Sequence, residues 1–212
     1  MAVPRIEIDL RKIAHNAERL RELNASKGID IFGVTKVVCG DPAVAAVLVK
    51  AGIKILADSR ISNIVRMRKA GIQAEYVLLR TAALSQAESV VKYADISLNS
   101  EMSVIERLST FAVRHNVSHK VILMVELGDL REGMMPADVV KMVEAVRSQK
   151  GIVLAGIGTN LACFGGIEPD KANIDRLSAL AVEIEAKFTT ELEFVSGGNS
   201  ANYDWFMSTT DT

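Results

Sequence analysis

Short apolar runs alternate along the chain with segments in which apolar residues recur every three or four positions. The apolar runs cover residues 31–38, 55–57, 76–79, 96–98, 121–127, 153–157 and 192–195. Most of them carry β-branched residues or leucine at successive positions, which is typical of strands buried on both faces of a parallel sheet. The pattern therefore predicts seven parallel strands.

The segments between the runs predict amphipathic helices. Leu10, Ile13 and Leu20 form one apolar stripe behind Asp9, a residue type that often caps helices. Further helix starts are predicted at Asp41-Pro42, at Ser85 with Glu88 as a capping box, at Ser100, at Pro136 and at Asp170. Predicted strands and predicted helices thus alternate along the chain.

This regular alternation is typical of a parallel α/β fold. A (β/α)8 barrel and an open doubly wound sheet both fit it. The regular repeat, and the lack of a G-x-G-x-x-G string after the first run, favour the barrel. Since the chain ends at Thr212 soon after the seventh run, the barrel is either completed in another way or truncated before its eighth strand. We expect an α/β TIM (β/α)8-type barrel, truncated there, as one domain over residues 1–212.

Composition narrows the class of protein. With 212 residues and 49% hydrophobic residues, the chain can build a barrel core. The net charge of −1 disfavours binding to nucleic acid or to a membrane surface. Two cysteines cannot form a disulfide framework, and the three histidines lack the spacing of metal ligands. No apolar run is long enough for a membrane span, and we expect a cytoplasmic protein. Because the histidines lack the spacing of metal ligands, we expect no bound metal.

Lys36 is the first candidate for chemistry, because active sites of barrels lie at the carboxyl ends of the strands. It lies inside the first apolar run, where burial would lower the pKa of its amine. A neutral amine is a nucleophile for aldehydes and a proton acceptor. The alternative is a lysine that reaches water or pairs with Asp58.

A glycine-, serine- and asparagine-rich loop follows the seventh run, and it contains Ser196, Gly198, Asn199 and Ser200. Its hydroxyls and backbone N–H groups suit a phosphate, although an ordinary turn would have the same composition. Together with Lys36, this loop would fit a phosphorylated aldehyde held as a Schiff base. Pyridoxal phosphate is the commonest cofactor of that kind.

Two other kinds of residue follow predicted strands. Arg131 lies in the polar segment 125–133, where it could face a cofactor's phenolic oxygen or a substrate carboxylate, or simply form an exposed salt bridge. Cys39 and Cys163 also lie near strand ends, but a small buried cysteine is the more common outcome there.

Several strings in order resemble the alanine racemase family, which has the fold-type III barrel of pyridoxal-phosphate enzymes. They are residues 34–36, 57–60, 92–101, 124–133 and 195–200. The resemblance covers essentially the whole chain and is closest to the ornithine racemase-like branch. In that family the lysine that corresponds to Lys36 is usually followed by Tyr-Gly-His-Gly, whereas in this chain Lys36 is followed by Val-Val-Cys-Gly. The difference argues against a standard alanine racemase and for the ornithine-type branch.

The resemblance implies roles for individual residues. Lys36 would carry the cofactor as a Schiff base and act as one of two racemisation bases. Arg131 would lie near the cofactor phenolate, and Asn160 takes the place of a histidine beside the pyridine ring in many relatives. Asn199 and Ser200 match the phosphate-binding pair, with Ser200 as the direct ligand. Ser196 and Gly198 belong to the same loop.

The family pattern also implies a homodimer and further parts of the site. Relatives take an arginine from the eighth strand to the pyridine nitrogen, and a second base, a tyrosine, from a C-terminal β-domain. The chain ends before both, so we expect it to be the N-terminal part of a longer protein. Within the chain, Cys163 is a candidate for the second base.

These observations predict a pyridoxal-phosphate-dependent amino-acid racemase that acts on ornithine-like substrates or on alanine. The main alternative is a non-catalytic pyridoxal-phosphate homeostasis protein of the same barrel fold. A metal-dependent retro-aldolase and a barrel without cofactor are further alternatives. An ornithine or lysine side chain would need an acidic partner in the pocket, for which Glu101, Asp129 and Glu132 are candidates.

Overall fold

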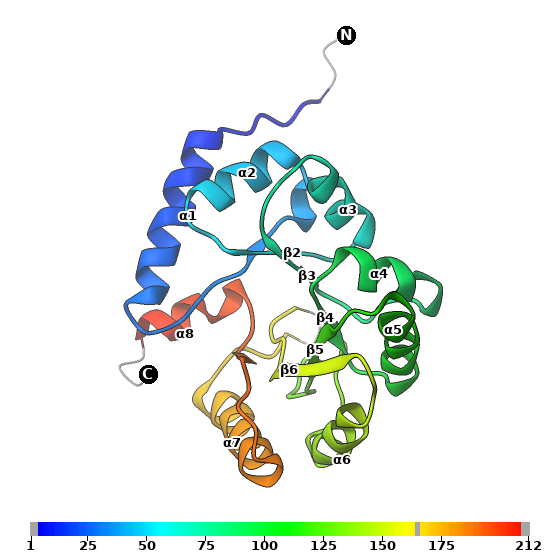
Figure 1. Cartoon of the computed structure of the whole chain (residues 1–212). Helices are drawn as coiled ribbons and strands as arrows, with labels where there is room; N and C mark the ends of the chain where they lie inside the picture. Colours follow the sequence, from blue (N-terminus) through cyan, green and yellow to red (C-terminus); the bar gives the residue numbers. More distant parts are fainter. Residues whose placement is uncertain (1–3, 164–165, 209–212) are drawn as a thin grey trace. The chain divides into compact units, whose positions relative to one another are not determined.

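The computed structural model describes residues 4–163 and 166–208 of the chain, which Figure 1 traces from end to end. The chain divides into two compact units, Met1–Leu79 and Arg80–Thr212. The division falls directly after the third strand.

The first unit consists of short parallel strands joined by helices. Its elements are α1 (Leu10–Ala25), β1 (Gly33–Val34), the 3-10 turn η1 (Lys36–Val38), α2 (Pro42–Lys50), β2 (Ile55–Asp58), α3 (Ile61–Lys69) and β3 (Glu75–Leu78). In register, Gly33 of β1 faces Leu56 of β2, and Ile55 of β2 faces Glu75 of β3. Strand order within the unit therefore follows chain order.

Two of the predicted helix starts in this unit are confirmed in atomic detail. The carboxylate of Asp9 accepts the N–H groups of Arg11 and Lys12 at the start of α1. The carboxylate of Asp41 accepts those at the start of α2, directly before Pro42. Both caps satisfy amides that have no partner within the helix.

The first predicted strand, residues 31–38, is wrong in its extent. Only Gly33–Val34 is extended, and Lys36–Val38 forms a 3-10 turn instead. The carbonyl of Thr35 accepts the N–H groups of Val38 and Gly40, which closes the turn. Cys39 and Gly40 continue it with positive φ values of 52° and 63°. The apolar residues here are misleading, because Val37 is 86% exposed.

The second unit has a longer strand–helix series. Its elements are η2 (Leu84–Gln86), α4 (Ala87–Tyr93), β4 (Ile96–Asn99), α5 (Met102–His115), β5 (His119–Met124), α6 (Pro136–Arg147), β6 (Ile152–Gly158), α7 (Lys171–Phe188), β7 (Phe194–Ser196), η3 (Ser200–Asn202) and α8 (Tyr203–Ser208). Strands β4 to β7 pair in parallel and in chain order, with a register shift between Val121 and Ile122. In Figure 1, α5 and α6 lie beside β4, β5 and β6.

In the second unit some predicted helix starts are confirmed and others are wrong. Asp170 caps α7 in a capping box with Asn173, as predicted for its position, and Pro136 begins α6. Ser85, however, lies inside η2 and makes no capping box with Glu88. Helix α5 begins one residue later than Ser100 predicts, with Glu101 in the capping position and no side-chain cap.

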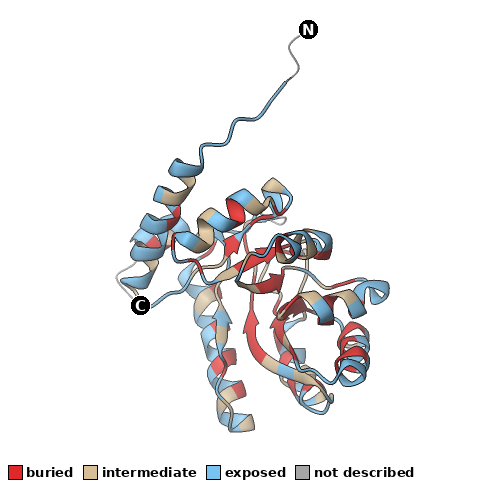
Figure 2. Cartoon of the chain, turned by 45° about the horizontal axis from the view of Figure 1, so that its top comes forward, coloured by how far each residue is buried: buried red, intermediate tan, exposed pale blue. Residues whose placement is uncertain are grey.

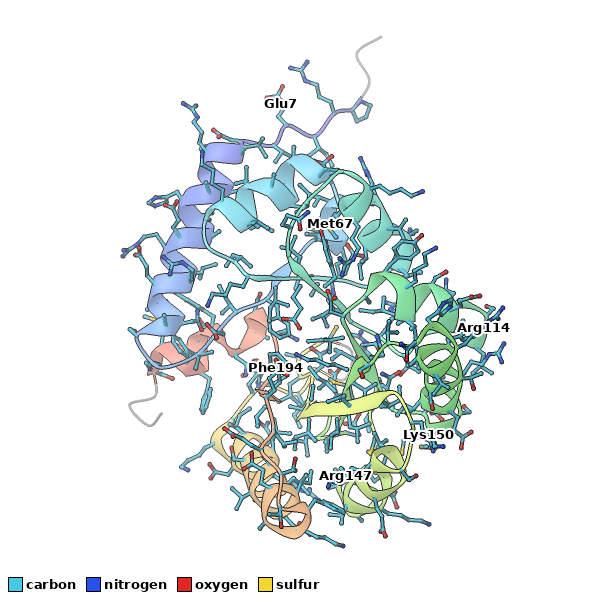
Figure 3. All side chains as sticks on the ribbon, in the orientation of Figure 1. Glu7, Met67, Arg114, Arg147, Lys150 and Phe194 are labelled. Carbon is cyan, nitrogen blue, oxygen red and sulfur yellow. The ribbon has the colours of Figure 1, made fainter. Side chains whose placement is uncertain are left out.

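Buried residues concentrate on the strands and on the helix faces that pack against them, as Figure 2 shows. The core of the first unit includes Met67 of α3, labelled in Figure 3, together with Leu56 and Tyr76. In the second unit, Ile105 and Leu108 of α5 are fully buried, as is Ile122 of β5. Parallel strands buried on both faces and connected through helices confirm the predicted α/β TIM-barrel class.

Candidate active site

Lys36 lies in the first unit, immediately past the end of β1, and begins η1. Its side chain is exposed, which contradicts the burial expected from the apolar residues around it. The neighbouring Thr35 is the residue that is fully buried. Because the chain leaves the strand at Thr35, the lysine that follows is presented outward from a tight turn.

A buried carboxylate holds that turn in place. Asp58, at the end of β2, accepts hydrogen bonds from the Thr35 hydroxyl at 2.8 Å, the Arg60 backbone N–H at 3.0 Å and the Asn63 side-chain amide at 2.9 Å. Asp58 is fully buried, so these donors balance a charge that water cannot reach. Asp58 makes no ion pair with Lys36 in the described part of this unit, in contrast to the simpler alternative considered for that lysine.

Gly40 completes the support of Lys36. A Cβ at this position would lie 2.7 Å from Cβ of Asn63, the same residue that binds Asp58. Together with its φ of 63°, this close approach requires glycine. The segment from Thr35 to Gly40 therefore packs directly on the start of α3.

The second unit contains an open hollow of about 500 Å³ at the carboxyl ends of its strands. It is lined by Arg80, Thr81, Ser100, Glu101, Arg131, Glu132 and Gly133. The lining includes two cationic and two anionic side chains, and the Ser100 N–H donates to the Thr81 hydroxyl at 3.2 Å. Such a surface suits a small ligand that carries charges of both signs.

Arg131 and Glu132 reach this hollow from a loop closed at its base. Val125 and Met134 form a bridge, in which Glu126 N–H donates to Met134 O at 2.8 Å and Met134 N–H donates to Met124 O at 2.9 Å. Gly133 has a φ of 115°, and a Cβ there would lie 2.6 Å from the Glu126 nitrogen. The loop is thus pinched at its neck by a glycine that no other residue can replace without a shift.

Arg131 is held by two neighbours. Its Nη1 donates to Cys163 Sγ at 2.6 Å, and its Nη2 lies 3.3 Å from Glu132 Oε1. The Cys163 N–H in turn donates to the buried Asp129 carboxylate at 3.0 Å. The salt bridge considered as the plain alternative for Arg131 is therefore present. Both cysteines are free and exposed, whereas burial was expected.

Asn160 and Asn199 come together, although they are 39 positions apart. Asn199 Nδ2 donates to Asn160 Oδ1 at 2.7 Å and to the Leu161 carbonyl at 2.9 Å. Its Oδ1 accepts the Ala201 N–H at 2.8 Å. Gly198 has a φ of 135° and lies against the Asn202 side chain, so the loop after β7 is tightly built. Ser196 ends β7 half-buried, and Ser200 is exposed.

A buried polar chain crosses β4 and β5 in the same unit. Ser97 Oγ lies 2.8 Å from His119 Nε2, and Asn99 Nδ2 donates to Ser97 Oγ at 2.9 Å. Burial lowers the pKa of His119 to about 4, although its hydrogen bond to the Ala94 carbonyl acts in the opposite direction. The imidazole is therefore neutral near pH 7. The sequence does not indicate these hydrogen-bonded side chains, because their positions belong to two strands predicted as buried.

The structure thus places the predicted residues in separate local settings. Arg131 meets Cys163, and Asn160 meets Asn199, both within the second unit. Lys36 belongs to the first unit, with Thr35, Asp58 and Asn63 as its support. The supporting role of Thr35 and Asn63 was not predicted from the sequence. The position of Asp58 directly after a predicted strand was the one signal that could have pointed to it. Among the described residues, no three His, Cys, Asp or Glu side chains gather as a metal site.

Comparison with known proteins places this geometry in a family. The pattern described as "Alanine racemase, N-terminal domain" matches residues 8–211. The chain belongs to the alanine racemase family. Family membership agrees with the fold and confirms the resemblance seen in the strings around Lys36, Arg131 and Ser200.

Two curated members of the family are similar over most of the chain. A lysine racemase from Thermotoga maritima is 39% identical over 200 residues, which cover 94% of this chain and 56% of that protein. An ornithine racemase from Acetoanaerobium sticklandii is 38% identical, with the same coverage. The chain therefore spans about half the length of these racemases.

A solved structure extends the comparison of the fold. The D-threonine aldolase of Filomicrobium marinum superposes with a TM-score of 0.81 at 21% identity, over 98% of this chain and 59% of that one. At this identity the likeness concerns the fold alone. In the part of the alanine racemase domain that the structure describes, no helix is both long and apolar enough to cross a membrane.

Proposed function

We propose that this protein is a pyridoxal-phosphate-dependent amino-acid racemase, an isomerase that interconverts the L and D forms of a small amino acid, as a homodimer. Its similarity to a lysine and an ornithine racemase supports a diamino acid such as ornithine as the substrate, with alanine as the alternative. The observation that carries the proposal is Lys36, an exposed amine on a turn fixed by the buried Asp58.

The donor chemistry of the described residues fits pyridoxal phosphate. Lys36 supplies the primary amine that an aldehyde requires, and the exposed Ser200 supplies a hydroxyl for the phosphate. Gly198, with its φ of 135°, has no side chain that would stand between its backbone N–H and a phosphate. When bound, the cofactor withdraws electrons from the Cα of an attached amino acid and so makes its proton acidic.

Asn199 has a different part in this proposal from the one its match to the family's phosphate-binding pair implied. Both hydrogens of its side-chain amide are already donated, to Asn160 and to the Leu161 carbonyl. Since a phosphate requires donors, Asn199 is better suited to hold the two loops together. Direct contact with the phosphate is then left to Ser200, to Ser196 and to backbone N–H groups of the loop, including that of Gly198.

Lys36 and Arg131 have separate parts in this proposal. Lys36 would supply the amine that holds the cofactor and that accepts and returns the Cα proton. Arg131, already oriented by Cys163 and Glu132, can donate to an oxygen anion of the bound cofactor. Racemisation also needs a second acid–base group, and Cys163 Sγ, in contact with Arg131, is the candidate within this chain.

The test is to reduce the complete gene product with borohydride in the presence of pyridoxal phosphate and to map the labelled peptide. We expect the label on Lys36, and we expect Lys36→Ala to lose both the label and racemisation of ornithine and alanine. A label elsewhere, or racemisation that survives in Lys36→Ala, would refute the proposal. A label on Lys36 without racemisation of any amino acid would instead support the carrier function.

A further inference from the structure

We propose that Glu101 binds the side-chain ammonium group of a diamino-acid substrate and so determines substrate class. The inference rests on the proposed function and deepens it. It starts from the hollow in the second unit, which is lined by two of the three acidic candidates, Glu101 and Glu132, but not by Asp129.

Two of these candidates are already engaged. Glu132 forms an ion pair with Arg131 at 3.3 Å, so each neutralises the other within the hollow. Asp129 is buried, and its Oδ1 accepts the Cys163 N–H at 3.0 Å, which holds two loops together. Glu132 therefore cannot turn to a ligand without breaking the contact that positions Arg131, and Asp129 does not line the hollow.

Glu101 differs from both. Glu101 is exposed, and its carboxylate makes no hydrogen bond or ion pair with any of the described residues. Although Glu101 occupies the capping position of α5, its side chain does not bond the helix amides. The hollow therefore contains one anionic side chain, Glu101, that has no direct partner among the described residues, beside the cationic side chain of Arg80.

Glu101 shares its hollow with Arg131 and with an unsatisfied hydroxyl. Ser100 Oγ, from the adjacent residue, is buried and has no hydrogen-bond partner among the described residues. A buried hydroxyl without a partner is costly, so a ligand that bonds it gains affinity. Arg131, the residue proposed to contact the cofactor, lines the same hollow. A substrate held near Arg131 would extend its side chain along this surface toward Glu101.

The chemistry selects an ammonium group on a flexible side chain. A carboxylate in an open, polar hollow attracts a cation and gains little from an apolar side chain. Ornithine and lysine carry that cation, whereas norvaline and norleucine have the same carbon skeletons without it. Comparison of these pairs isolates the charge interaction from the length of the side chain.

The experiment measures racemisation of L-ornithine and L-norvaline by the pyridoxal-phosphate-loaded protein and by Glu101→Gln. We expect the KM for ornithine to rise about tenfold in Glu101→Gln, while the KM for norvaline stays within twofold. Glu101→Asp should recover part of the loss. Glu106→Gln, which removes an exposed charge from the same helix outside the hollow, should change neither value.

Calorimetric titration of the cofactor-free protein with L-ornithine gives a readout besides activity, and we expect weaker binding in Glu101→Gln. If wild-type protein racemises both substrates and Glu101→Gln affects them equally or not at all, this inference is overturned while the proposed function stands. If wild-type protein racemises no amino acid, the proposed function is overturned and the inference falls with it.

Discussion

The hydroxyl of Thr35 donates a 2.8 Å hydrogen bond to Oδ2 of Asp58, which ties the turn that presents Lys36 to the end of the neighbouring strand. The two residues are both fully buried, and two further donors converge on the same carboxylate. The position of Lys36 therefore depends on a polar contact in the core as well as on its own strand.

Replacement of Asp58 by alanine should destabilise the protein by about 2–4 kcal/mol, because it leaves buried donors without a partner. Thr35→Val should cost less, about 1 kcal/mol, since Asp58 keeps its other two donors. Urea unfolding followed by circular dichroism measures both. Asp30→Ala, at an exposed position, is the control and should stay within about 0.5 kcal/mol of wild type. Equal effects of Asp58→Ala and Asp30→Ala would contradict the assigned role.

Stability should fall in mild acid because of His119. Its pKa is lowered to about 4 in the folded protein from 6.5, so the unfolded chain binds a proton more readily between these values. The stabilisation is present above pH 6.5 and is lost as the pH falls toward 4, by about 3 kcal/mol in total. His119→Gln should be less stable than wild type but should show a flatter dependence over this range. Chemical unfolding at a series of pH values measures the slope, and His15→Gln, at an exposed site, should leave it unchanged.

Asn199→Ala should weaken the connection between the loops after β6 and β7. The substitution removes the donors to Asn160 and Leu161 as well as the acceptor for Ala201, and we expect a loss of about 1–2 kcal/mol. It should also raise the dissociation constant for pyridoxal phosphate, measured by titration of its absorbance, because the loop that contains Ser200 is no longer held. Asn116→Ala, a helix-end substitution elsewhere in the same unit, is a control that should change stability but not cofactor affinity.

Gly133→Ala should be more harmful than Gly71→Ala. Both glycines have positive φ, 115° and 77°, so alanine is strained at either position. At Gly71 nothing lies within 4 Å of the new Cβ, and the cost should be about 1 kcal/mol. At Gly133 the Cβ would meet the Glu126 backbone at 2.6 Å, so the neck of the loop must open. Thermal unfolding should show the larger loss for Gly133→Ala, and similar losses would argue against a tight neck.

The strands and most helix boundaries could be predicted from the sequence because burial imposes a simple pattern on them. Residues 55–57 are apolar since both sheet faces are covered, and Asp9, Asp41 and Asp170 cap helices through local contacts. The first strand was predicted too long because Val37 is apolar yet exposed. No local pattern reveals that the chain turns at Thr35.

The site itself was harder to predict, because its organisation depends on contacts between distant positions. Lys36, Arg131 and Ser200 could be chosen by their place after strands and by resemblance. Asp58 as the acceptor for Thr35, and Asn199 as the partner of Asn160, join residues 23 and 39 positions apart. Only the folded backbone sets which donor meets which acceptor over such separations.

The pinched loop that carries Arg131 and Glu132 has a consequence for protein engineering. Its two ends are joined by main-chain hydrogen bonds between Glu126 and Met134 and between Met134 and Met124. These bonds fix the points at which the loop leaves and rejoins the rest of the fold. We expect that the interior of a segment bounded in this way can be lengthened, shortened or exchanged with that of another member of the family while the anchors stay in register. Chimeras made at this neck would exchange pocket charges without disturbing the strands that hold them.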